Sequence, residues 1–310
     1  MADEKKATFD AGLIGLGNMG QGLGKNILEN GFSLVVQDLK PSAVSRLEER
    51  GAVGAIDLKS LMSQTDIVMT CLPSMSSIEA VYESPDGIIA NVRPGMVIVD
   101  FSTSNPELTR RYGAMLEEKG AQLIDTPMLR NPQAAFDGTL QLLVSGPDDA
   151  IERAKPLLEA VSEELIPSGD LGNGHAIKLI NNAVTIANGA ILCETFTVAR
   201  KMGIDLNTLN RVMGVSFAAS KKLPDTARRL IEDDHKNTFS IDVSLKDIDL
   251  FTKLSLELGA LTPIAEATRD LFRMASQFGY GDEHNTRVGS VLARFVGTDF
   301  GEEESKKASS

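Results

Sequence analysis

The amino-acid sequence predicts a doubly wound α/β domain followed by an all-α domain. Short apolar runs alternate with stretches of helical periodicity from residue 11 to about residue 165, which is typical of βαβ units and a mostly parallel sheet. Beyond residue 172 the strand-like period disappears, and helical patterns continue to about residue 295. We therefore expect two domains, at residues 9–168 and 169–297, and a polar, disordered tail at residues 298–310.

The apolar runs of the first domain are the expected strands, and they cover Ala11–Ile14, Ser33–Gln37, Ile67–Cys71, Val97–Asp100, Gln122–Asp125, Leu140–Ser145 and Glu164–Pro167. The stretches between them are the expected helices, at residues 21–30, 43–50, 57–63, 75–82 and 107–119. Pro106 suits the first turn of the last of these helices, and Gly120 suits its end.

A glycine-rich segment, Gly15-Leu16-Gly17-Asn18-Met19-Gly20, connects the first expected strand to the first expected helix. Gly15 permits a tight turn, Gly17 lets the backbone approach a pyrophosphate at the helix N-terminus, and Gly20 lets helix and strand pack closely. In this context the segment predicts a Rossmann-type dinucleotide site, against the alternative of a merely glycine-rich turn.

An acidic residue at the end of the second expected strand supports this prediction. Asp38 lies 18 residues after Gly20, close to the position of the acid that accepts hydrogen bonds from an adenosine ribose. A carboxylate there repels a 2′-phosphate, which favours NAD, with Leu39 beside it in the site. NADP is the alternative, because Lys40 could pair with that phosphate.

The second domain opens on a long helix, expected from Gly174 to Met202, that is apolar nearly all round. Such a helix is normally buried on all sides, either at the centre of the domain or shared with a second subunit. The further helices are expected at residues 206–213, 218–233, 242–259, 263–279 and 282–295.

Two polar residues interrupt this apolar helix. Lys178 and Asn182 have i, i+4 spacing and therefore share one face. Lys178 could donate a proton to a substrate carbonyl, while Asn182, and Asn181 in addition, could orient the substrate oxygens. The alternative is a lysine that extends to solvent and an asparagine that bonds a loop.

Two segments that follow expected strands are further candidates. After Asp100, a hydroxyl such as that of Thr103 could face a ligand, while Ser104 or Asn105 caps the next helix. The connection from residue 125 to residue 140 is long and expected to be irregular. Arg130 within it could bind a carboxylate, sulfonate or phosphate, or could simply solvate the loop.

Composition argues against several classes of function. The formal net charge of −12 disfavours a nucleic-acid surface and docking on anionic lipid. Cys71 and Cys193 lie in apolar runs and are expected to be buried free thiols, and the three histidines form no metal-binding pattern, so no metal is expected. We expect no apolar run of the length of a membrane span, and the first nine residues lack the apolar region of a signal peptide, so a cytoplasmic location is expected.

From about residue 10 to residue 295, the chain resembles the β-hydroxyacid dehydrogenases, the family of 3-hydroxyisobutyrate dehydrogenase and tartronate semialdehyde reductase. The matching motifs are Gly15–Gly20, Leu72-Pro73, Ser102-Thr103, Asp125-x-Pro127 with Gly138-Thr139-Leu140, Gly174-x-x-x-Lys178-x-x-Asn181-Asn182, and Lys246-Asp247.

The resemblance implies a role for particular residues. Lys178 is the catalytic lysine, and Asn182 and Thr103 contact substrate. The cofactor is lined by Leu72, Pro73 and Ser77, in addition to Gly15, Leu16, Gly17, Asn18, Met19, Asp38, Leu39 and Thr103. Lys246 closes over nicotinamide and substrate. The resemblance also implies a homodimer or homotetramer formed through the helical domain.

The substrate segment departs from the family pattern. The family usually has Asp-x-Pro-Val-Ser-Gly-Gly, whereas this chain has Leu129-Arg130-Asn131 at the Ser-Gly-Gly positions. The segment is partly similar to the Gly-Arg-Thr of the sulfolactaldehyde reductases, which bind a sulfonate. We therefore expect a strongly anionic substrate group at Arg130 and Asn131.

The alternatives are an imine reductase on the same scaffold and a non-catalytic dinucleotide-binding protein. Imine reductases commonly replace the lysine, and a sensing protein would have a lost lysine or a blocked pocket. Decarboxylating phosphogluconate dehydrogenases have a longer chain and a histidine between the lysine and the asparagine, where this chain has Leu179-Ile180-Asn181.

Overall fold

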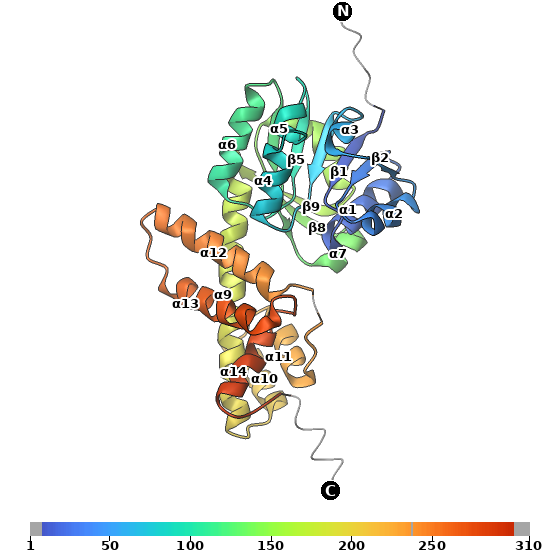
Figure 1. Cartoon of the computed structure of the whole chain (residues 1–310). Coiled ribbons are helices and arrows are strands. Elements are labelled where there is room, and N and C mark those ends of the chain that lie inside the picture. The colour runs from blue at the N-terminus through green and yellow to red at the C-terminus, as the bar shows by residue number, and fades with distance from the viewer. Residues whose placement is uncertain (1–7, 237, 301–310) are drawn as a thin grey trace, which may run out of the picture. The chain divides into compact units, whose positions relative to one another are not determined.

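A computed structural model describes residues 8–236 and 238–300 (Figure 1). The chain divides into two compact units, Met1–Lys178 and Leu179–Ser310, which are called the N-terminal and C-terminal units below.

The N-terminal unit is built on a sheet that has nine strands among the described residues, in the order β3-β2-β1-β4-β5-β6-β8-β7, with β9 paired to β8. The strands are β1 Ala11–Ile14, β2 Leu34–Gln37, β3 Val53–Gly54, β4 Ile67–Thr70, β5 Val97–Asp100, β6 Gln122–Asp125, β7 Met128–Leu129, β8 Leu140–Ser145 and β9 Ser162–Gly169. Strands β1 to β6 pair in parallel, β8 runs antiparallel to β6 and β7, and β9 runs parallel to β8. The predicted mostly parallel sheet is therefore confirmed.

Helices cover both faces of this sheet (Figure 1). They are α1 Asn18–Glu29, α2 Pro41–Glu48, α3 Leu58–Met62, α4 Met75–Glu83, α5 Ile88–Asn91, α6 Pro106–Glu117, α7 Pro132–Asp137 and α8 Asp148–Glu159. Successive strand residues point to opposite faces, so Leu13 joins the core under α1, α2, α7 and α8 while Ile14 joins the core under α3 to α6. The doubly wound architecture follows from this alternation.

Five elements of this unit were not predicted from the sequence: β3, β7, α5, α7 and α8. Strands β3 and β7 have two residues each, and α5 and α7 have four and six, so they are too short to show a period. Helix α8 is a full amphipathic helix with Pro156 inside it. Its existence could have been inferred from its two acidic residues in the first turn.

The C-terminal unit is helical throughout its described part, as predicted. Helix α9 Asn173–Lys201 carries the boundary between the two units and ends close to Gly203, whose φ is +73°. The others are α10 Leu206–Gly214, α11 Leu223–Glu232, α12 Ile241–Glu257, α13 Pro263–Ala275, the π-helical turn η1 Ser276–Tyr280, and α14 Arg287–Phe295. Their core contains Phe196, Ile248 and Phe272.

Helix α9 is less buried than its composition predicted. Ile180, Val184, Ile191 and Val198 are each more than half exposed, so the expectation of burial on all sides is wrong for the single chain. The helix is also long and apolar enough to cross a membrane, with 44% of its most apolar window buried, which corrects the expectation that no run reaches that length. One such helix is weak evidence, because core helices of water-soluble proteins pass the same test.

The expected tail is ordered at its start. Phe300 is 3% exposed and belongs to the core of the C-terminal unit, and the Asp299 carbonyl accepts a hydrogen bond from Arg200 Nε at 2.9 Å. Residues 298–300 therefore belong to the folded unit. The rest of the expected tail, residues 301–310, lies outside the described residues, as do residues 1–7 of the expected polar N-terminus.

Candidate active site

The glycine turn after β1 has the geometry that the sequence predicted. Gly15 has φ +90°, and a Cβ added there would lie 2.4 Å from the Cys71 carbonyl oxygen. A Cβ on Gly20 would lie 2.1 Å from the Gly15 carbonyl oxygen. Both positions require glycine, because a side chain would collide with the backbone at the end of β4 or with the backbone of the turn itself.

The start of α1 suits a bound pyrophosphate. Gly17 is the N-cap, has no side-chain cap among the described residues, and a Cβ built on it meets none of the described atoms within 4 Å. The first N–H groups of α1, from Asn18 onward, therefore have no side-chain acceptor at the N-cap, and a phosphate binds well at such a helix end. The residues present fit a dinucleotide.

Asp38 closes the same turn. Its Oδ2 accepts a hydrogen bond from Leu16 N at 2.6 Å, and its Oδ1 accepts one from Lys40 N at 2.7 Å. A carboxylate has about four acceptor positions, so both oxygens keep capacity for ribose hydroxyls. Leu39 beside it is 94% exposed, and Met19 packs against the core below the turn.

The ends of β4 and β5 place the next group of predicted residues. Ser102 Oγ accepts a hydrogen bond from Leu72 N at 3.0 Å, which ties the Leu72-Pro73 turn to the segment after β5. Ser77 lies in the first turn of α4, where its N–H donates to the capping hydroxyl of Ser74 at 3.1 Å. The carboxyl ends of these parallel strands lie at the same edge as the glycine turn, which is where ligands of this architecture bind.

The segment after β5 combines a helix cap with a candidate ligand contact. Asn105 caps α6, its Oδ1 accepting from Glu107 N at 2.7 Å, and Pro106 is in the first turn, as the sequence predicted. Thr103 precedes the cap and is partly exposed.

Lys178 is held by the segment that follows β6. Its Nζ donates a hydrogen bond to the Met128 carbonyl oxygen at 2.6 Å. Three backbone N–H groups around the start of α9 are bound by side chains from the ends of β6 and β8. Gly172 N and His175 N donate to Asp125 Oδ1 and Oδ2 at 2.7 and 2.8 Å, and Gly174 N donates to Ser145 Oγ at 2.6 Å. The sheet thus fixes both the helix start and the lysine one turn later.

The substrate segment is not the irregular loop that the sequence predicted. It forms strand β7 and helix α7, and Asn131 caps α7 by accepting from Ala134 N at 3.1 Å. Helix α7 packs on α1, where a Cβ added to Gly22 would lie 2.5 Å from the backbone of Ala135. The side chain of Asn131 therefore has a structural role in this conformation.

Arg130 also has intramolecular partners. It has φ +77°, an uncommon conformation for a residue with a side chain. Its guanidinium donates to the Thr139 carbonyl oxygen at 2.9 Å and forms an ion pair with Glu163 of β9. Glu163 was not predicted as a partner of Arg130, because nothing in its position along the chain connects it to residue 130.

The predicted residues of the C-terminal unit form a group of their own. Asn182 is 6% exposed, and its Nδ2 donates to Asp247 Oδ2 at 2.6 Å. Lys246 Nζ pairs with Asp247 Oδ1 at 2.8 Å, and Asn181 Nδ2 donates to Asn182 Oδ1 at 3.1 Å. Asp247 therefore holds both Asn182 and Lys246.

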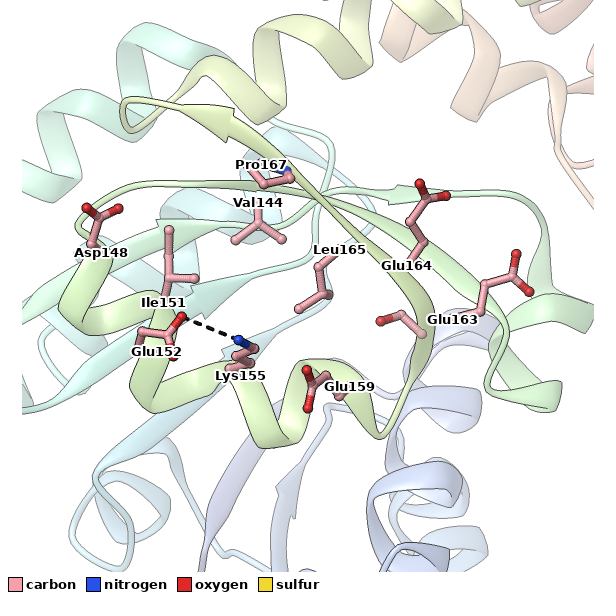
Figure 2. Close-up of a pocket in the computed structure, with 11 residues that line it drawn as sticks. Val144, Asp148, Ile151, Glu152, Lys155, Glu159, Glu163, Glu164, Leu165 and Pro167 are labelled. Carbon is pink, nitrogen blue, oxygen red and sulfur yellow. Dashed lines mark ion pairs between the residues drawn. The ribbon is translucent and has the colours of Figure 1, made fainter.

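A cavity of about 480 Å³ lies elsewhere in the N-terminal unit, between α8 and β9 (Figure 2). Its lining includes the acidic side chains of Asp148, Glu152, Glu159, Glu163 and Glu164, with Lys155 paired to Glu152 at 3.5 Å. None of the predicted site residues lines it, and its carboxylates would repel an anionic ligand. Within the described ranges there is no group of three His, Cys, Asp or Glu residues that could hold a metal ion.

Two family models match the chain. Residues 10–169 match the NAD binding domain of 6-phosphogluconate dehydrogenase, and residues 172–292 match the NAD-binding domain of NADP-dependent 3-hydroxyisobutyrate dehydrogenase.

Curated relatives match over most of their length. A 2-(hydroxymethyl)glutarate dehydrogenase of Eubacterium barkeri is 28% identical, over 92% of this chain and 95% of its own. A 3-sulfolactaldehyde reductase of Escherichia coli is 29% identical, over 86% and 90%, and a 3-hydroxyisobutyrate dehydrogenase of Pseudomonas aeruginosa is 30% identical, over 86% and 92%.

Solved structures share the fold. Psf3 in complex with NADP+ and 2-OPP superposes with a TM-score of 0.83, at 25% identity, covering 91% of this chain and 99% of that one. A Streptomyces aurantiacus imine reductase, at 20% identity and a TM-score of 0.62, shows the fold alone.

Proposed function

The chain belongs to the β-hydroxyacid dehydrogenase family, and from this premise we propose that it interconverts a small anionic 3-hydroxy acid, or a hydroxy sulfonate, and the corresponding semialdehyde. The chain is an oxidoreductase that uses a nicotinamide dinucleotide. NAD(H) is the preferred cofactor in this proposal because of Asp38, and NADP(H) is the alternative.

The observation that carries the proposal is the placement of Lys178. Its ammonium lies against the Met128 carbonyl, on a helix whose first turn is bound by side chains of the sheet. A lysine held in this way can donate a proton to the carbonyl oxygen of an aldehyde, which becomes the alcohol. When bound, the nicotinamide supplies the hydride for the carbonyl carbon. In the reverse direction, Lys178 accepts the hydroxyl proton as general base.

The other predicted residues would bind and orient the substrate. We assign the hydroxyl of Thr103, the amide of Asn182 and the ammonium of Lys246 to the substrate oxygens and the cofactor. Asp247 supports this assignment for Asn182 and Lys246, because its two carboxylate oxygens hold both side chains. Arg130, with Asn131 beside it, is assigned to the anionic group. For this role the guanidinium would exchange Glu163 for the ligand.

The function is tested by NADH oxidation with a panel of semialdehydes, namely sulfolactaldehyde and the succinic, tartronic and methylmalonic semialdehydes. Turnover of at least one of them, abolished in Lys178→Ala, is the expected result. Turnover of the sulfonate alone would support the Arg130 assignment, and turnover of carboxylates alone would exclude a sulfonate as substrate. If no semialdehyde reacts and a cyclic imine does, the proposed reaction is wrong and the imine reductase alternative is correct.

We further propose that the protein is a homodimer or homotetramer formed through the C-terminal unit, in the cytoplasm. The exposed apolar residues of α9 support this assembly, because a contiguous apolar stripe along a helix is usually covered by another protein surface. Val184→Asp is expected to shift the molar mass measured by light scattering to that of the monomer. Ile56→Asp, at an exposed apolar residue of the N-terminal unit, is the control and should leave the mass unchanged.

A further inference from the structure

The short helix of the substrate segment packs on the helix that begins at the glycine turn. Helix α7 has six residues and lies beside α1 (Figure 1). A helix this short is marginal in water by itself, so its position depends on what it packs against. On α1, Gly22 and Asn26 have i, i+4 spacing and share the face that α7 covers. A Cβ added to Gly22 would lie 2.5 Å from the Ala135 carbonyl carbon, so the two backbones approach closely there.

The side-chain amide of Asn26 binds the C-terminal end of α7. Asn26 is 6% exposed, and its Nδ2 lies 2.7 Å from the Ala135 carbonyl oxygen and 3.3 Å from that of Phe136. The same nitrogen lies 2.9 Å from the carbonyl oxygen of Gly22. Carbonyl oxygens only accept, so the NH₂ group of the amide must face all three of them. One N–H therefore binds α1 itself, and the other is shared by two carbonyls of α7.

A charged donor supports the same contact. Lys25 Nζ donates to the Phe136 carbonyl oxygen at 2.9 Å and pairs with Glu29 Oε2 at 2.8 Å. The last carbonyl groups of a helix have no partners within it. The Ala134 carbonyl of α7 accepts from backbone N–H groups that follow the helix, whereas those of Ala135 and Phe136 accept from side chains of α1. The two neighbouring side chains of α1 therefore complete the C-terminal cap of α7.

Hydrogen bonds continue from this contact to the residues assigned to the substrate. Ala135, whose carbonyl oxygen accepts from Asn26, donates its N–H to the carbonyl oxygen of Asn131 at 3.2 Å. Thr139 donates its N–H to a carbonyl of α7 at 2.9 Å, and its own carbonyl oxygen accepts from the Arg130 guanidinium at 2.9 Å. A displacement of α7 away from α1 would therefore move Asn131 and a partner of the Arg130 guanidinium together.

We propose that Asn26 is a positioning residue for the anionic group of the substrate. It acts by binding α7, and with it Arg130 and Asn131, to α1. Lys178 is bound through Met128 of strand β7, which precedes α7 in the chain. Asn26 therefore affects substrate binding more than proton transfer. The anchoring of α7 follows from the contacts alone, whereas the effect on substrate binding rests on the proposed function.

The anchoring of α7 is tested by hydrogen exchange of the intact protein, measured by mass spectrometry of peptides that cover residues 132–139. In Asn26→Ala this segment should exchange roughly tenfold faster than in wild type, because α7 loses a donor from α1. The matched control is Asn30→Ala, one turn further along α1, whose Nδ2 donates to the carbonyl oxygens of Asn26 and Ala160, outside α7. Equal exchange of the segment in wild type and Asn26→Ala would overturn the proposal, whether or not the protein has the proposed activity.

The effect on the substrate is tested by kinetics with the semialdehyde that wild type turns over best. Asn26→Ala should raise KM for the semialdehyde about fivefold or more, while kcat changes less than about threefold and KM for NADH less than about twofold. A lower Tm with all three constants as in Asn30→Ala would exclude the positioning role and leave the proposed function intact. Wild type that turns over no semialdehyde would overturn the proposed function, and with it the substrate role of Asn26, while hydrogen exchange still decides the anchoring of α7.

Lys25 provides a second variant if Asn26→Ala does not fold. Lys25→Met removes the donor to the Phe136 carbonyl at a partly exposed position and keeps an unbranched apolar side chain. It should speed exchange of residues 132–139 and raise KM for the semialdehyde, each about threefold. The control is Glu29→Gln, which removes the ion pair with Lys25 but leaves its bond to Phe136, so both values should be unchanged. Exchange and KM equal to wild type in Lys25→Met would contradict the proposal.

Discussion

The segments that follow strands β1 and β6 lie in the same unit, yet they differ in what determines their structure. After β1, Gly15 has φ +90°, and a Cβ on Gly20 would lie 2.1 Å from the Gly15 carbonyl oxygen, so the segment's own backbone requires glycine at both positions. After β6, the side chain of Arg130 is held by Glu163, a residue 33 positions away. The first segment is determined by residues adjacent in sequence and the second by a partner that only the fold brings close.

This difference shows which sequence motifs can be interpreted locally. A glycine pattern specifies backbone geometry, and the geometry itself creates the phosphate site at the start of α1. An arginine specifies a charge with a reach of several ångströms, and its partner depends on what the fold places within that reach. The identity of a charged residue in a loop is therefore weaker evidence for a ligand than a glycine turn at a helix start.

The largest expected effect concerns Lys178, which the segment after β6 holds through the Met128 carbonyl. Lys178→Ala should lower kcat/KM by roughly 10²–10⁴-fold, the usual contribution of general acid–base catalysis. NADH binding, measured by fluorescence titration, should stay within twofold. Lys155→Ala, at a partly exposed lysine of α8 outside the proposed site, is the control. An active Lys178→Ala would show that this segment does not hold the catalytic group.

Two glycine variants would separate turn geometry from ligand contact. Gly20→Ala places a Cβ 2.1 Å from the Gly15 carbonyl oxygen, so we expect a lower Tm and at least a roughly tenfold weaker affinity for NADH. Gly17→Ala meets none of the described protein atoms, so Tm should be unchanged while NADH affinity falls. Equal NADH binding by Gly17→Ala and wild type would contradict the predicted pyrophosphate position.

Arg130 and Glu163 provide the matching test for the segment after β6. If Arg130 binds the anionic group, Arg130→Ala should raise KM about 10-fold, the loss of one charged hydrogen bond. Glu163→Gln should lower KM, because the Arg130 guanidinium then binds the anionic group of the substrate without first giving up its ion pair with Glu163. If the arginine is only structural, both variants should change Tm and neither should change KM.

The C-terminal unit contains buried histidines whose environment is also decided by the fold. Burial, followed by the charges of Arg229 and Lys222, lowers the pKa of His284 to about 3, and burial lowers the pKa of His235. The unfolded chain binds protons more readily below about pH 6.5, so stability is full above that pH and falls as the pH drops toward 3. Denaturant titration should show a loss on the order of 2–3 kcal/mol between pH 7 and pH 4.5.

A variant checks the source of this acid sensitivity. His284→Gln cannot take up a proton, so its stability should fall less steeply with pH, even if it is less stable than wild type at pH 7. Parallel pH profiles for wild type and His284→Gln would assign the sensitivity to other groups.

The smallest effect is expected at the cysteines, which their apolar surroundings in sequence predicted to be buried free thiols. Cys193 is buried, whereas Cys71 is only partly buried, so the prediction is wrong for Cys71. Burial raises the pKa of both Cys71 and Cys193 to about 12, so few thiolates exist at pH 8. Iodoacetamide at pH 8 should therefore leave activity unchanged, and mass spectrometry should detect labelling only after unfolding. Rapid labelling of the native protein at Cys71 would show that the thiol beside the glycine turn is accessible.

The sequence by itself determined most of the longer strands and helices, the glycine turn, Asp38 at the end of β2, and the lysine and asparagine that share a face of α9. Each of these depends on residues close together in the chain, where periodicity, backbone freedom and helix spacing act directly. The tertiary structure decided that Arg130 pairs with Glu163, that Asn131 caps α7, and that Asp125 and Ser145 bind the start of α9. It also placed His175 between Asp100 and Asp125, because strands β5 and β6 end side by side and bring together carboxylates that the sequence keeps 25 positions apart.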